Sequence, residues 1–506
     1  MTASKHITVS GAPEGFDARL ILAEAEKGPV VHVCRDDKRL EATRAALAFF
    51  APDMPVIVFP GWDCLPYDRV SPNADVAAAR MAVLAGLAHG MPSKFVLLTT
   101  LNAATQKVPA RDVLREAAFS ARVGGRIDEG ALRAFLVRMG FVQSPTVTEP
   151  GDYAVRGGII DIYPPGQSGP VRLDLFGDDL DGARRFDPAT QRTTETLDVV
   201  ELAPVSEVIL DGAAITRFRQ NYRLEFGAAG TDDPLYEAVS AGKKHAGVEH
   251  WMAFFHENLE TLFDYLPGAT VTLDEQNAAQ RQARWDSIAD QYDARREAML
   301  AKGRMDSVYK PAKPDGLYLD GPAWDGAVAD KRVLQFGALP QATGLNVIDA
   351  GGRIGRNFAP ERQQDSISLF GALAQHLKAK LQDGPVVVAS YSEGARERLM
   401  GLIEDEGLAE TIPVTDFTRV GKSGLHLAVW ALDHGFEAKG LTVVSEQDVL
   451  GDRLIRQTKR KKRAENFLTE TQSLTPGDLV VHVDHGVGRY LGLEVITAAG
   501  AAHECL

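Results

Sequence analysis

The strongest constraint on the fold is a regular alternation of apolar β-type runs and helical patterns in residues 29–100. Strand-like runs at 29–34, 55–59 and 95–100 are separated by helical patterns at 37–50 and 75–89. Such alternation is typical of a parallel sheet covered by helices, because parallel strands need long crossover connections. A second unit of this kind is predicted at 345–448, around a strand at 385–390, a helix at 392–406 and a strand at 441–445. The sequence therefore predicts an α/β multidomain fold.

Between these units, from Gly151 to about Pro204, the pattern changes to short β runs separated by turn residues, which predicts an antiparallel β-rich insert. In the run Val171–Phe176, alternation places Val171, Leu173 and Leu175 on one face and Arg172, Asp174 and Phe176 on the other. Arginine and aromatic side chains are enriched at protein interfaces, so the second face is a candidate docking surface. A solvated face with one stray aromatic side chain remains the alternative.

The remaining segments are helical or basic in pattern. A helical region at 234–262, a charged helix at 274–300 and a loop at 310–321 are expected. Residues 449–473 form a helix-compatible stretch with seven basic side chains between Arg453 and Arg463. This stretch reads as a solvated linker or as a local contact with nucleic acid or an acidic partner. Residues 476–496 predict two strands around a turn at His485–Gly488.

Charge and composition exclude several classes of function. The 55 basic and 69 acidic residues give a net charge of −14, which repels a phosphate backbone, so any DNA contact must be local. Three widely spaced cysteines carry no disulfide or zinc pattern, and apolar runs are too short to span a bilayer. We therefore expect a cytoplasmic protein with reduced thiols and no membrane partner.

No catalytic or cofactor-binding constellation is predicted. Gly421–Ser423 resembles the end of a phosphate-binding loop, but Asp416 stands where the first glycine is required. His482 and His485 are three residues apart on an expected strand, which points them to opposite faces and disfavours shared metal ligation. We therefore predict no catalytic residue, cofactor or metal within these residues.

Four separated motifs, in the same order, resemble the bacterial transcription-repair coupling factor family. These are Phe59–Asp68 continuing through Ser71–Pro72 to Arg80, Tyr153–Pro164, Arg172–Phe176 with Phe186–Asp187 and Thr190–Arg192, and Val480–Tyr490. The resemblance covers essentially the whole chain and is weakest between about 205 and 470. It implies a degenerate helicase-like (RecA-like) parallel-sheet domain, similar to that of UvrB, formed by residues 1–118 and 205–340.

The resemblance also implies the other domains. An inserted β-rich UvrA-binding domain is expected at 119–204, a small α/β domain at 345–448 and a basic linker helix at 449–473. Residues 474–506 would be a truncated, CarD-like RNA polymerase interaction domain, the start of a Tudor/SH3-like β-barrel. In the family, an ATP- and Mg²⁺-dependent translocase on double-stranded DNA follows. Its motifs are absent here, so we expect an N-terminal fragment without ATPase activity.

The resemblance assigns partners to individual residues. The family's UvrA contacts fall on Arg156, Arg172 and Phe176, and a weaker assignment places contacts with the RNA polymerase β subunit on Arg489, Tyr490 and Leu491. The expected function is recruitment of UvrA to sites where RNA polymerase stalls at DNA lesions. UvrB itself is one alternative, but its phosphate-binding loop is missing near Ala23–Gly28. A CarD-like transcription regulator or stand-alone adaptor is another, although CarD shares only the terminal hairpin.

Overall fold

The computed structural model divides the chain into two units, residues 1–451 and residues 452–506. It describes residues 5–117, 119–227, 233–300, 309–364, 368–408, 411–451, 479–482, 486–489, 494–498 and 501–505. The basic segment Arg453–Arg463 and the candidate contacts Tyr490 and Leu491 lie outside the described residues. Each unit is described by itself.

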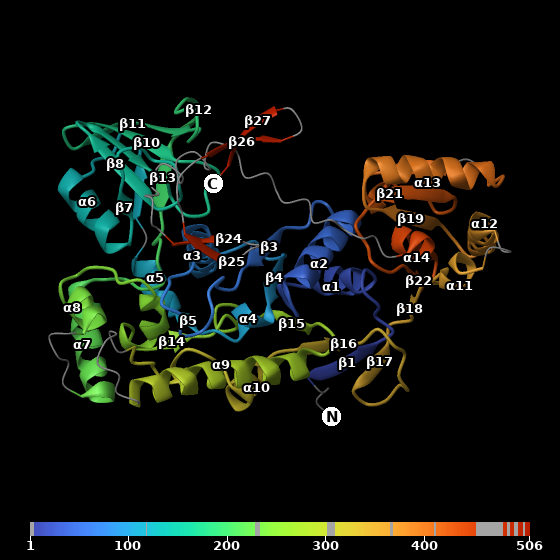
Figure 1. The fold of residues 1–506 in the computed structure, drawn as a ribbon, viewed down its shortest axis with the longest axis horizontal. Coiled ribbons are helices and arrows are strands. Elements are labelled where there is room, and N and C mark those ends of the chain that lie inside the picture. Colours follow the sequence, from blue (N-terminus) through green and yellow to red (C-terminus); the bar gives the residue numbers. More distant parts are fainter. Residues whose placement is uncertain are drawn as a thin grey trace. The chain divides into compact units, whose positions relative to one another are not determined.

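A seven-stranded sheet forms the first part of the larger unit (Figure 1), in the order β17-β1-β16-β15-β2-β4-β3. Its strands are β1 (His6–Ser10), β2 (Val30–Cys34), β3 (Val56–Phe59), β4 (Val96–Thr100), β15 (Thr270–Leu273), β16 (Val333–Phe336) and β17 (Val347–Asp349). Every pairing in this sheet is parallel, as predicted for residues 29–100. β17 pairs with β1, so the first sheet reaches into the range assigned by sequence to the small α/β domain.

Helices cover both faces of this sheet because alternate strand residues point to opposite sides. Helices α1 (Asp17–Ala25) and α2 (Asp37–Phe50) pack with Val30 and Cys34 on one face. Helices α3 (Ala74–His89) and α10 (Gly321–Val328) pack with Val31 and Val33 on the other. The side chain of Asp36 accepts a hydrogen bond from the Arg39 N–H and begins α2 one residue later, as the sequence predicts.

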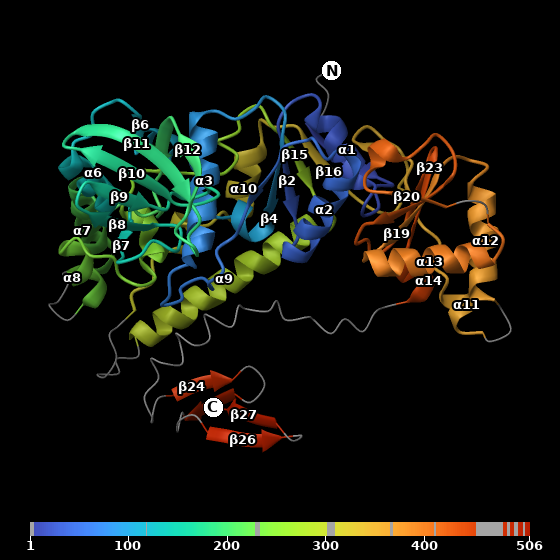
Figure 2. The ribbon, with the colours of Figure 1, turned by 90° about the horizontal axis from the view of Figure 1, so that it is seen from above.

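The six-stranded sheet that follows is antiparallel except at one edge. Its order is β12-β11-β10-β9-β8-β7, and β7 pairs with β8 in parallel. The strands are β7 (Val142–Gln143), β8 (Asp152–Arg156), β9 (Ile159–Ile162), β10 (Val171–Phe176), β11 (Asp179–Phe186) and β12 (Thr193–Leu197). Figure 2 shows α6 (Glu129–Arg138) against this sheet, where its apolar side chains join the core of one face. On the opposite face, Val147, Ala154 and Phe186 form a second, smaller buried cluster.

Short elements link this sheet to the first one. Helix α4 (Leu101–Ala104) follows β4, α5 (Arg111–Glu116) precedes the insert, and β6 (Phe119–Arg122) pairs with β13 (Val199–Leu202). The pair β6–β13 holds the chain together where it enters and leaves the insert. The two-residue strand β5 (Val108–Pro109) pairs with β14 (Leu259–Glu260).

An aromatic-rich helical cluster follows the insert. It contains α7 (Gly212–Phe226), α8 (Pro234–Ser240), the 3-10 segment η1 (Val248–Phe254) and α9 (Asn277–Leu300), a single continuous helix in Figure 2. The prediction of helix throughout 234–262 is wrong at its end, because β14 forms at Leu259–Glu260, where its partner strand β5 competes successfully with helix propensity. The loop predicted at 310–321 contains the 3-10 turn η2 (Pro314–Gly316) and an isolated bridge at Tyr318, and α10 begins at its last residue, Gly321.

The second parallel sheet is also confirmed. Its order is β18-β22-β23-β19-β21-β20, with β19, β20, β21 and β23 parallel. The strands are β18 (Arg353–Ile354), β19 (Val386–Ser390), β20 (Thr411–Val414), β21 (Leu425–Val429), β22 (Phe436–Ala438) and β23 (Leu441–Ser445). The helices are α11 (Ala359–Arg362), α12 (Leu369–Lys380), α13 (Glu393–Asp405), the 3-10 turn η3 (Phe417–Arg419) and α14 (Glu446–Leu450). Phe49 of α2 stacks on Trp430 after β21, with ring centroids 4.6 Å apart, so the two α/β parts share a core.

The C-terminal unit contains two antiparallel pairs among its described residues. Strands β24 (Leu479–His482) and β25 (Gly486–Arg489) pair, as do β26 (Glu494–Ala498) and β27 (Ala501–Cys505). The predicted turn at His485–Gly488 is therefore wrong in part, because Gly486–Gly488 are extended and Val487 lies opposite Val481. In the range of the second predicted strand, which continues to Ile496, the described residues Gly486–Arg489 and Glu494–Ala498 pair with different strands.

Among the described residues, no helix is both long enough and apolar enough to cross a membrane.

Candidate functional site

The face of the six-stranded sheet opposite α6 carries the candidate site. The alternation predicted for β10 is confirmed: Val171, Leu173 and Leu175 are buried, Arg172 and Asp174 are half-buried, and Phe176 is exposed. The buried side chains join α6 in one core, so Arg172 and Phe176 face away from it. We call Arg156, Arg172 and Phe176 the docking face.

Arg172 is held by the carboxylate of Asp161, which lies directly opposite it on β9. Arg172 Nε donates to Asp161 Oδ1 at 2.7 Å and Nη2 donates to Oδ2 at 2.8 Å. The Arg172 guanidinium also lies 4.8 Å from the centre of the buried Phe186 ring. The hydrogen bonds to Asp161 hold the pKa of Arg172 above its ordinary value. Arg172 therefore presents a permanent positive charge in a defined plane.

Arg156 lies beside the same carboxylate but is held less tightly. Its Nη1 is 3.9 Å from Asp161 Oδ2, and its Nη2 donates to the carbonyl oxygen of Pro145. The Arg156 side chain is 52% exposed, against 24% for Arg172. The structure therefore brings the two predicted arginines together around one acidic group.

Phe176 provides the apolar part of the docking face. It is 83% exposed at the end of β10, an unusual position for a large aromatic side chain. Ile159, 39% exposed, lies opposite Asp174 on the neighbouring strand and so faces the same side. Like Phe176, it adds exposed apolar surface to a face that otherwise carries charged groups.

The turn between β8 and β9 depends on glycine. Gly157 has φ +62°, in the region that favours glycine, and a Cβ on Gly158 would lie 2.4 Å from the carbonyl oxygen of Leu175. Leu175 N–H in turn donates to the carbonyl oxygen of Gly158 at 2.7 Å. The two glycines thus let β10 approach the hairpin that carries Arg156 and Asp161.

A buried ion pair ties the end of the insert to the first sheet. Arg80 of α3 donates from Nε and Nη2 to the carboxylate of Glu207 at 3.0 and 2.8 Å. Glu207 also accepts from Trp62 Nε1 at 2.7 Å. Trp62 and Arg80 belong to the motif at 59–80, so this motif has a structural role in anchoring the segment that returns from β13.

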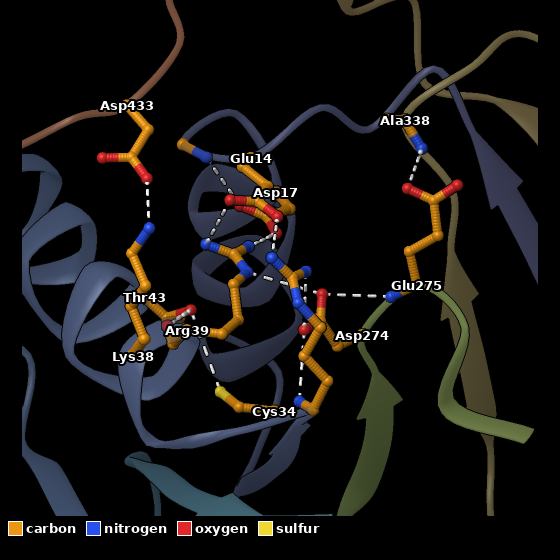
Figure 3. Close-up of polar contacts among 12 residues, drawn as sticks. Glu14, Asp17, Cys34, Lys38, Arg39, Thr43, Asp274, Glu275, Ala338 and Asp433 are labelled. Carbon is orange, nitrogen blue, oxygen red and sulfur yellow. Dashed lines mark hydrogen bonds and ion pairs between the residues drawn. The ribbon is translucent and has the colours of Figure 1, made fainter. Parts of the chain in front are cut away.

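Ion pairs of the chain itself lie at the carboxyl ends of β2 and β15 (Figure 3). Doubly wound sheets usually bind ligands at this end. Here Arg39 of α2 donates from Nη2 to the carboxylate of Asp17 at the start of α1. Its Nε lies 3.4 Å from Asp274 Oδ1. Asp17 also accepts from the backbone N–H of Gly15 at 3.0 Å. A carboxylate of the chain therefore occupies the helix N-terminus, where a phosphate binds in nucleotide sites.

This cluster contains more acidic than basic groups. Glu14 and Arg35 complete it, with Arg35 Nη2 2.7 Å from Glu14 and Arg35 Nη1 3.3 Å from Asp274. Burial raises the pKa of the Asp17 carboxyl to about 6; Arg39 opposes the rise, and the negative charges of Asp274 and Glu14 add to it. Burial likewise raises the pKa of the Cys34 thiol, which keeps this cysteine protonated.

The remaining sequence candidates lie elsewhere. Gly421–Ser423 lies between η3 and β21, whereas a phosphate-binding loop follows a strand and leads into a helix. Ala23–Gly28 lies at the end of α1 and in the turn after it. Arg489 is exposed and pairs through its backbone with Leu479 on β24. No group of three metal-ligating side chains is present among the residues that the structure describes.

Sequence reasoning missed three residues of the docking region. Asp161 is 2% exposed yet supports both arginines, and Arg184 lies directly opposite Arg172 on β11. Ile159 is the third. Alternation along β9 could have placed Ile159 and Asp161 on one face. The register that brings this face beside Arg172 cannot be predicted from the sequence of either strand alone.

Two family models match the chain. The UvrB interaction domain matches residues 119–207, which include the six-stranded sheet and the docking face. The CarD-like/TRCF RID domain matches residues 474–506 of the smaller unit.

Curated relatives match nearly the whole chain. Transcription-repair-coupling factors of Escherichia coli and Myxococcus xanthus are each 30% identical to it, over 96% and 95% of its length. That of Haemophilus influenzae is 28% identical over 89%. The chain spans about two fifths of the length of these relatives, 42%, 42% and 39% respectively. Together with the two family models, these matches show that nearly the whole chain is similar to part of the transcription-repair-coupling factors.

Proposed function

We propose that this chain captures UvrA through the docking face and so recruits nucleotide excision repair to transcription sites. The observation that carries the proposal is the joint presentation of Arg156, Arg172 and exposed Phe176 on one face of the sheet. Two cations beside an exposed aromatic suit a partner with acidic groups and an apolar pocket. The match of residues 119–207 to the UvrB interaction domain supports a protein-binding role for this sheet.

The other parts of the proposal follow from the family. Residues 474–506 would contribute to RNA polymerase binding, which their match to the CarD-like/TRCF RID domain supports, and Arg489 with Tyr490 and Leu491 would contact the β subunit of the polymerase.

 In this proposal the seven-stranded sheet is a degenerate helicase-like fold, with the ion pairs around Arg39 in place of a nucleotide. ATP, Mg²⁺ and double-stranded DNA would be bound by a motor domain of the kind found in whole members of the family.

The experiment is capture of this 506-residue chain by immobilised UvrA. Arg156→Ala and Arg172→Ala should each weaken capture while the chain stays folded. Arg172→Ala should also lower the midpoint of unfolding, because it leaves the buried Asp161 with Arg156 as its nearest cation. Unchanged capture by both variants would contradict the proposal.

A further inference from the structure

A buried acidic group, Asp161, lies beside the two arginines of the docking face, too deep for a partner to reach directly. Asp161 is 2% exposed, yet it points to the side of the sheet that carries Arg156 and Arg172. A buried carboxylate is retained only where cations or hydrogen-bond donors compensate its charge. Here both compensating groups belong to the docking face, so the role of Asp161 is linked to theirs.

The strand register explains how one carboxylate serves both arginines. Arg172 is opposite Asp161 on one side, and Ala154 is opposite it on the other. Because the side chain of Ala154 is small, it leaves room for the side chain of Arg156, two residues further along β8, to reach Asp161. Arg156 Nη1 lies 3.9 Å from Asp161 Oδ2. The planar fork of Arg172 matches both carboxylate oxygens, at 2.7 and 2.8 Å.

Without the negative charge of Asp161, the positive charge of Arg172 would be repelled by neighbouring arginines. Arg184 lies directly opposite Arg172 on β11, and like charges at opposed strand positions are unfavourable. Arg184 is paired with Asp174, which leaves Asp161 as the group that neutralises Arg172. Asp161 and the Phe186 ring together set the plane of the Arg172 guanidinium. A side chain ordered before binding loses less entropy when a partner docks.

We propose that Asp161 is a positioning residue for partner capture, which holds Arg172, and more weakly Arg156, in the orientation that receives an acidic group of the partner. The inference rests on the proposed UvrA docking. It adds a residue that would act through the two arginines and would not touch UvrA itself.

The test is a titration of UvrA with the 506-residue chain carrying Asp161→Asn, which removes the charge and keeps the shape. We expect affinity to fall about tenfold, as for loss of a hydrogen bond between charged groups. In an Arg172→Ala background, Asp161→Asn should cause less than a twofold further loss, because its effect passes mainly through Arg172. The matched control is Glu195→Gln, which breaks the 3.1 Å pair with Arg185 in the same sheet and should change affinity less than twofold.

The outcomes separate the inference from the proposed function. Weaker binding by Arg172→Ala with unchanged binding by Asp161→Asn would overturn the positioning role alone, and so would an equal loss in both backgrounds. Unchanged binding by Arg172→Ala and Arg156→Ala would overturn the UvrA docking itself. If Asp161→Asn fails to fold, Asp161→Glu decides the matter: it restores the charge and should bind within about threefold of the original chain, and a tenfold loss in a folded Asp161→Glu protein would refute the role.

Discussion

Arg80 and Glu207 form a fully buried, two-pronged ion pair that joins α3 to the segment returning from the six-stranded sheet. Their nitrogen–oxygen distances are 3.0 and 2.8 Å, and the side chains are 0% and 2% exposed. The Arg80 guanidinium also lies 4.4 Å from the centre of the Phe59 ring and donates to the carbonyl oxygen of Pro60 at 2.8 Å. The pair thus combines charge, hydrogen bonding and aromatic packing at one joint.

Arg80→Ala should lower the free energy of unfolding of this region by about 3–5 kcal/mol, because it leaves Glu207 buried without its cation. Hydrogen exchange near Trp62 and Glu207 would measure the change. Arg44→Ala is the control, since Arg44 pairs with Glu41 at the surface and should contribute less than about 1 kcal/mol. Equal effects of the two substitutions would contradict the role given to the joint.

Gly158→Ala should destabilise the hairpin of β8 and β9 by on the order of 2 kcal/mol, because the new Cβ would lie against the Leu175 carbonyl oxygen, 2.4 Å away in the present geometry. Gly394→Ala should instead stabilise α13 by about 0.5 kcal/mol, since nothing lies within 4 Å of its Cβ position. Urea unfolding of both variants measures these effects. A stabilising Gly158→Ala would show that the close approach of β10 does not need glycine.

Asp17 should make stability depend on pH in a direction opposite to that of most carboxyl groups. Its pKa is about 6 in the folded chain and 3.8 in the reference state, so the folded state binds the proton more tightly. Stability from this group therefore falls as pH rises from about 4 to 6. Between pH 5 and pH 7 the loss should be about 1 kcal/mol.

Asp17→Asn provides the comparison for that effect, because it cannot titrate. From pH 5 to pH 7, the unfolding free energy of the original chain should fall by about 1 kcal/mol relative to that of Asp17→Asn. A difference that stays constant across this range would show that Asp17 keeps an ordinary pKa.

Local patterns predicted the elements well where one face of an element is buried. The helix Asp37–Phe50 and the alternation Val171–Phe176 follow directly from residue spacing and from the capping side chain of Asp36. The placement of β15 and β16 between β2 and β1 could not be predicted in this way, because these strands lie more than two hundred residues from their partners. Only the family resemblance joined residues 1–118 to 205–340.

The candidate site, too, could be predicted from the sequence only in part. Arg172 and Phe176 share a face because of strand periodicity, which sequence alone reveals. The contacts of Arg172 with Asp161 and Phe186 depend on strand register and hairpin geometry, which are properties of the assembled sheet. The resemblance named the partner, and the structure supplied the charges that surround each arginine.

The most direct test of the account is the affinity of UvrA for the chain carrying Phe176→Ala. Phe176 is 83% exposed and makes no core contact that would be lost, so the variant should fold normally. If it fills an apolar pocket of UvrA, affinity should fall by about thirtyfold, equivalent to about 2 kcal/mol. Leu224→Ala, at an equally exposed apolar residue on α7, should change affinity less than twofold. Equal affinities of the Phe176→Ala variant and the original chain would contradict UvrA docking on this face.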